Sequence, residues 1–148
     1  MAAGDTKLMN DYVRKDREGV YAIADNWQLV FVSDTFASIN SDATNPTSAT
    51  YTVVSGGNFA ANYPLSSEAI TRSGAVIKFD ANDIGQQLKN ASNPAIKCAV
   101  LINATNSNDS CQAWDLTSDG TTAVDTVNND FTFNFGGGGI NTSTNTST

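Results

Sequence analysis

The sequence predicts an all-β sandwich or barrel of about seven or eight short, mainly antiparallel strands with a short N-terminal helix. Asn, Thr and Ser occupy 17, 17 and 14 of the 148 positions, and these residues favour turns because their side chains compete for backbone hydrogen bonds. Between the turns lie short runs rich in Val, Ile, Thr and aromatic residues, which are typical of strands. The length suits one domain.

A helix is expected over residues 6–18, which we treat as part of an N-terminal helical arm, residues 1–19. Gly19 is placed to end it. A helix of this length is marginal in water by itself, so its apolar stripe must be buried against the sandwich or against a partner. Both alternatives stay open, and the candidate partner-interface residues are Leu8, Met9, Tyr12, Val13 and Arg14.

The following segment, residues 20–140, is expected to form the β-sandwich domain. Residues 27–32 place apolar side chains on both faces of a strand, which indicates cover on both sides. Residues 84–88 are expected to form one helical turn. Further strands are expected at residues 51–54, 75–79, 95–103, 112–116, 121–126 and 131–135.

The C-terminal segment, residues 141–148, reads NTSTNTST and contains no apolar residue. Four glycines and Ile140 precede it. A segment with so little to bury cannot offset the entropy of ordering. We therefore expect a flexible Asn/Ser/Thr tail from residue 141 onward.

Charge and composition exclude several classes of function. The net charge of −7 and the pI near 4.2 argue against nucleic acid as a partner. The chain has no His, which excludes a Ser-His-Asp triad and a His-ligated metal. Asp80 and Asp83 form the nearest thing to a carboxylate pair, and turn capping explains them better. We predict no enzyme activity, no catalytic residue, no cofactor and no metal site.

The chain shows no targeting or membrane signal. It has no apolar run near the length of about 18 residues that a membrane span needs, and residues 1–19 lack the apolar core of a secretory signal. We therefore expect synthesis in a cytoplasm and no membrane partner. Cys98 and Cys111 are interpreted as buried reduced thiols, since disulfides are uncommon in a cytosol.

A series of motifs covers most of the chain. After the helical segment come a "Gly-Gly-Asn" loop at 56–58, a strand ending in "Asp-Ala-Asn-Asp" at 80–83, and an "Ala-Val-Leu-Ile-Asn" strand at 99–103. A "Trp-Asp-Leu" return strand at 114–116 and an "Asp-Phe-Thr-Phe" strand that runs into Gly-Ile at 140 complete it. This order resembles that of small structural proteins of tailed bacteriophages.

The resemblance implies a virion structural protein, most of all a decoration or cement protein of the capsid surface, made in the host cytoplasm. It implies the major capsid protein or another virion protein as partner, and self-association as a homotrimer. The family carries no catalytic residues.

Two alternatives remain. The first is a structural protein of the neck or tail. The second is a carbohydrate- or host-surface-binding module that uses aromatic side chains, although aromatics at a spacing of two are more often core. The aromatic residues concerned are Trp27, Trp114, Phe131, Phe133 and Phe135.

Overall fold

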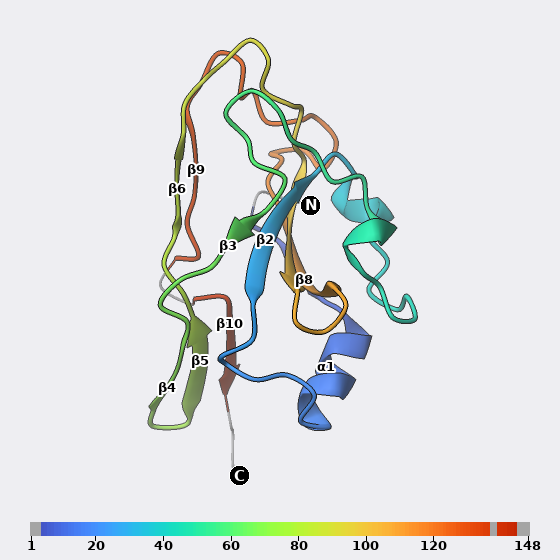
Figure 1. The fold of residues 1–148 in the computed structure, drawn as a ribbon, viewed down its shortest axis with the longest axis vertical. Helices are drawn as coiled ribbons and strands as arrows, with labels where there is room; N and C mark the ends of the chain where they lie inside the picture. The colour runs from blue at the N-terminus through green and yellow to red at the C-terminus, as the bar shows by residue number, and fades with distance from the viewer. Residues whose placement is uncertain (1–3, 137–138, 145–148) are drawn as a thin grey trace.

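The computed structural model describes residues 4–136 and 139–144. Over this part of the chain it is a sandwich-like all-β fold of antiparallel sheets with one short helix, as the sequence predicts (Figure 1). The helix is α1 (Asn10–Arg17), and short 3₁₀ turns lie at Phe36–Ser38 and Ser48–Thr50. The strands are β1 (Thr6–Leu8), β2 (Trp27–Val32), β3 (Tyr63–Pro64), β4 (Ala69–Ser73), β5 (Val76–Asp80), β6 (Ile84–Gln87), β7 (Cys98–Asn103), β8 (Asp109–Asp115), β9 (Phe131–Phe133) and β10 (Asn141–Thr144).

The largest sheet has the strand order β1-β8-β7-β2-β3, and its neighbours are antiparallel. Strands β7 and β8 are buried along their whole length. The apolar run from Cys98 to Ile102 suits this central position, because a strand covered on both faces needs no polar alternation. Strand β2 pairs with β7 from Trp27 opposite Asn103 to Val32 opposite Cys98.

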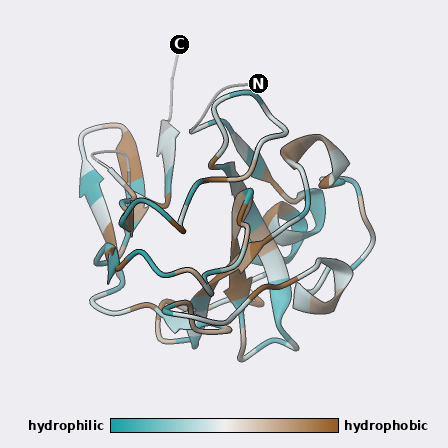
Figure 2. Ribbon diagram, turned by 90° about the horizontal axis from the view of Figure 1, so that it is seen from above, coloured by the Kyte–Doolittle hydropathy of each residue, from teal (hydrophilic) through white to brown (hydrophobic). Residues whose placement is uncertain are grey.

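An aromatic cluster fills the interior between the sheets. Phe31 of β2 packs against Phe59, Tyr63, Phe131 and Phe133, with ring centroids 5.7, 5.3, 5.4 and 6.2 Å away. Strand β9 brings the last two rings into the core by pairing with β6. Figure 2 shows the hydrophobic residues concentrated on interior strands, while the connecting loops are mainly hydrophilic.

A second sheet has the order β10-β5-β4. Strands β4 and β5 form a hairpin with two turn residues, and Gly74 adopts a φ of +60° at the first of them, which a type II′ turn requires. Alternation along the strands places Ile70, Ile77 and Phe79 on one face. The sheet lies at the same end of the molecule as α1 (Figure 1).

The helix prediction for residues 6–18 is wrong at its start. Thr6–Leu8 is strand β1, in which Thr6 lies opposite Trp114 of β8, and Met9 is still extended before the helix begins at Asn10. The backbone groups at the edge of β8 can hydrogen-bond to residues 6–8 when these are extended. Residues 6–8 would not make these bonds in a helix. The segment before Gly19 is therefore an edge of the main sheet followed by a helix packed on β8, and not a separate arm.

Four further predictions differ from the structure. Residues 51–54 and 121–126 are not strands: each segment has only one isolated bridge, Val53 to Val32 and Val124 to Ile96. Residues 84–87 form strand β6 instead of a helical turn, because β9 lies opposite them. Asn141–Thr144 forms strand β10 against β5 instead of a flexible tail. Ile140 holds the start of β10 in place. Its side chain is buried, and its carbonyl oxygen accepts a 2.7 Å hydrogen bond from Nε2 of Gln112. The rest of the expected tail, residues 145–148, lies outside the described residues.

Cys98 and Cys111 are buried and free, as favoured from the sequence. Burial, reinforced by the nearby Asp115 carboxylate, raises the pKa of Cys98 to about 12. Within the described residues, no helix has the length and apolar character needed to cross a membrane.

Candidate functional site

Exposed apolar side chains surround a groove between the β10-β5-β4 sheet and the segment around α1. Ile23, Ile70 and Ile77 are 39%, 63% and 46% exposed, which is unusual for isoleucine. The groove has a volume of about 300 Å³. We call it the aromatic groove, and its main lining residues are Tyr12, Tyr21, Ile23, Trp27, Ile70, Ile77 and Phe79.

Four aromatic rings form the floor of the groove. Tyr21 lies 5.4 Å from Tyr12 and 5.8 Å from Trp27, centroid to centroid. Trp27 lies 5.2 Å from Phe79 of β5 and donates a 3.1 Å hydrogen bond from Nε1 to the carbonyl oxygen of Ala22. This chain of ring contacts connects α1 to the second sheet and gives the floor a fixed shape.

The four rings of the floor carry no charge at neutral pH, and the Asp16 carboxylate also lines the groove. Burial raises the pKa of Tyr12 to about 12, and the negative charge of the neighbouring Asp16 carboxylate adds to this effect. Burial also raises the pKa of Tyr21, whose hydroxyl donates a 2.9 Å hydrogen bond to Oδ2 of Asp109. An uncharged aromatic floor with an isoleucine rim is suited to binding an apolar side chain.

The five residues predicted for a partner interface do not form one surface. Met9 and Tyr12 are buried in the chain's own core, and Val13 is partly buried against it. Arg14 lies in ion pairs of 2.7 Å with Asp11 and with Glu18. Leu8 remains exposed, on β1.

Met9, Tyr12 and Val13 therefore pack on the chain's own sandwich, whereas Leu8 does not. Only Tyr12 of the five lines the groove. Sequence reasoning missed Ile23, Ile70 and Ile77 as site residues. Ile77 lies in the expected strand 75–79, whereas Ile23 and Ile70 lie in no element that the sequence predicts. Alternation along 76–80, which places Ile77 and Phe79 on one face, is the available signal for Ile77.

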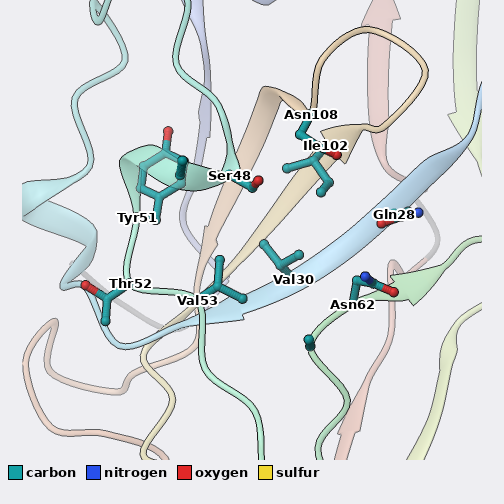
Figure 3. Close-up of a pocket in the computed structure, with 11 residues that line it drawn as sticks. Gln28, Val30, Ser48, Tyr51, Thr52, Val53, Asn62, Ile102 and Asn108 are labelled. Atoms are coloured by element: carbon teal, nitrogen blue, oxygen red, sulfur yellow. The ribbon is translucent and has the colours of Figure 1, made fainter.

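A second hollow lies over β2 and has a volume of about 510 Å³. Figure 3 shows Val30, Val53 and Ile102 in its middle, with the amides of Gln28 and Asn62 to one side and Tyr51 to the other. The Tyr51 hydroxyl is already engaged, at 3.0 Å from Oγ of Ser110.

The aromatic residues considered for a ligand-binding face are core residues. Trp27, Trp114, Phe133 and Phe135 are buried, and Phe131 is partly buried. Trp114 packs edge-on against Phe133 and Phe135 at 5.6 and 5.8 Å. Trp27 is the one of these five that lines the aromatic groove.

The two candidate carboxylates are each engaged, one with a neighbouring lysine and the other with a distant backbone amide. Asp80 pairs with Lys78 at 2.6 Å, and Oδ1 of Asp83 accepts a 2.8 Å hydrogen bond from the Phe135 amide. Over residues 4–136 and 139–144, no group of three His, Cys, Asp or Glu side chains is placed to hold a metal ion.

Comparison with known proteins yields no match: no family model fits the chain, and neither a curated protein nor a solved structure is similar to it.

Proposed function

We propose that this protein is a structural component of a tailed-bacteriophage particle, a decoration protein that binds the assembled head shell and stabilises it. The observation that carries the proposal is the aromatic groove, where Ile23, Ile70 and Ile77 stay exposed around an uncharged floor. Exposed apolar residues that gather at one place mark binding surfaces. The order of sequence motifs supports the choice of partner, the major capsid protein.

The groove suits a contact protein because its shape is fixed by the fold. Its floor joins α1, the β2 start and β5 through ring contacts, so little side-chain freedom remains to be lost on binding. An apolar side chain of the shell would fill the groove, and the net charge of −7 would keep unbound copies soluble.

Stabilisation of the shell would follow from mass action. A protein that binds the assembled shell and not its free subunits shifts the equilibrium toward assembly. The test uses purified heads that lack this protein, to which the full chain is added before heating. We expect many copies to bind over the shell surface and the temperature of shell disruption to rise.

The same experiment separates the decoration role from the neck or tail. Binding in a single ring at one vertex would replace the decoration role with a connector role. Heads that bind no chain and melt unchanged would contradict a structural role on the head.

A second candidate function, binding of a carbohydrate or host surface, rests on the hollow of Figure 3. Its volume falls in the range of small-ligand sites, and amide groups beside an aliphatic floor can orient a polar ligand. Binding to a glycan array that is lost on Asn62→Ala, with Leu88→Ala as the control, would support this alternative. An array without signal would remove it.

A further inference from the structure

The outer edge of β4 has no strand beside it among the described residues, since the sheet order is β10-β5-β4. The carbonyl oxygen of Phe79 accepts a 2.8 Å hydrogen bond from the amide of Ile140, so Phe79 turns its polar backbone groups toward β10. Ile70 lies opposite Phe79 in the β4–β5 pair. In an antiparallel pair the backbone of Ile70 then faces away from β5, and that of Arg72 does the same.

The side chains along this edge carry a distinct pattern: Ile70 and Arg72 are exposed, and Glu68 is half-buried. Ile70 is 63% exposed and has Glu68 two positions before it and Arg72 two positions after it. Residues two apart in an extended chain share a face. Neither Glu68 nor Arg72 forms an ion pair with another residue in the described part of the chain.

This pattern is complementary to itself in the antiparallel direction. When two such strands are centred on Ile70, the two isoleucines lie opposite each other. Glu68 of one strand then faces Arg72 of the other, and the same pair occurs a second time by symmetry. Opposite charges and apolar side chains directly across a strand pair stabilise it, and like charges would oppose it.

We propose that two copies of this chain associate through their β4 edges, as an isologous pair in which the two three-stranded sheets become one continuous sheet. The outward N–H and C=O groups of Ile70 and Arg72 would supply the main-chain hydrogen bonds, as in strand addition generally. Pairing would also remove an exposed edge, which soluble proteins rarely leave open.

Charge complementarity identifies a second copy as the partner strand. A partner strand must place a basic residue opposite Glu68, an apolar residue opposite Ile70 and an acidic residue opposite Arg72. The chain's own segment 68–72 meets all three requirements. The symmetry is two-fold, in place of the homotrimer that the phage resemblance implies, and the proposal does not depend on what the groove binds.

The test measures the mass of the full chain by sedimentation equilibrium. We expect a dimer for the natural sequence. Glu68→Arg and Arg72→Glu should each weaken the dimer about tenfold or more, because each makes both cross-strand charge pairs repulsive. An equimolar mixture of the two variants should form a heterodimer, since every charge pair is again opposite, and the double variant should dimerise as the natural chain does.

The natural chain sedimenting as a monomer or trimer would overturn the proposal. So would single variants that dimerise normally, or a mixture that stays monomeric while its circular dichroism spectrum is native. Because Glu68 is half-buried, Ile70→Lys provides a second disruptive variant at an exposed position. It should be a folded monomer, and a folded dimer would also count against the proposal.

Discussion

The ammonium nitrogen of Lys15 lies 2.7 Å from Oδ2 of Asp109, the same oxygen that accepts the hydroxyl hydrogen bond of Tyr21. Lys15 lies on α1, and Asp109 is the first residue of β8. The contact therefore connects the helix to the main sheet beside the aromatic groove. Burial lowers the pKa of Lys15, but hydrogen bonds to Asp109 and Asp11 outweigh it and leave that pKa above its ordinary value.

Replacing Asp109 should therefore destabilise the fold. Asp109→Asn leaves the largely buried Lys15 without its strongest partner, and we expect a loss of about 1–3 kcal/mol in the free energy of unfolding. Urea denaturation followed by circular dichroism measures it. Asp11→Asn is the matched control, since it removes only helix-surface pairs worth a few tenths of a kcal/mol (about 0.2–0.5 each). Equal losses of unfolding free energy in the two variants would show that the Asp109 contact stabilises the fold no more than the helix-surface pairs do.

Gly139 should not tolerate a side chain. Its φ is +66°, and a Cβ atom there would lie 2.6 Å from the carbonyl oxygen of Phe79, on the strand that β10 joins. Gly136 has a similar φ of +71° but open space around it. We expect Gly136→Ala to cost about 1–2 kcal/mol from backbone strain alone, and Gly139→Ala to cost clearly more. The difference in thermal unfolding midpoint tests this, and equal midpoints would contradict the contact.

The strands with their own apolar signal could be predicted from the sequence. The run 98–102 is apolar throughout and 27–32 is apolar on both faces, because burial leaves a pattern in the residues. Thr6–Leu8 and Asn141–Thr144 have no such pattern. They are strands because the edges of β8 and β5 offer hydrogen-bond partners, which is tertiary information that local propensity does not contain.

The groove could be predicted only in small part, because it is assembled from separate segments. The sequence predicts Tyr12 as an apolar helix residue of a partner interface, and Tyr12 does line the groove. Ile23 and Ile70 lie 47 positions apart, and neither belongs to an element that the sequence predicts. Only the packing of the β4–β5 hairpin against the segment after α1 brings them to one rim.

Alkaline pH should destabilise the protein. Burial raises the pKa of Tyr12 from 10.0 and that of Cys98 from 9.0, in both cases to about 12. The unfolded chain therefore releases these protons at lower pH than the folded chain does. Their contribution to stability is fully present below pH 9 and declines as pH rises toward about 12.

The urea midpoint measured across this pH range should fall continuously. Tyr12→Phe removes the phenolic proton, so its midpoint should fall less steeply than that of the natural chain above pH 10. A variant whose pH profile has the same slope would mean that Tyr12 does not contribute to the alkaline loss.

Ile77 should contribute to binding through the groove without contributing much to folding. Its side chain is 46% exposed on the rim, so Ile77→Asp should change the free energy of unfolding by no more than about 0.5 kcal/mol. A carboxylate beside the aromatic floor would have to lose water when an apolar partner enters, which is costly. We therefore expect binding to purified heads to weaken by about tenfold or more.

Leu88→Asp provides the control, because Leu88 is 56% exposed and does not line the groove. The two variants carry the same change in charge, so a general repulsion between the more acidic chain and the shell would weaken both equally. Loss of binding in Ile77→Asp alone would locate the shell contact in the groove. Equal binding by the two variants and the natural chain would place the contact on another surface.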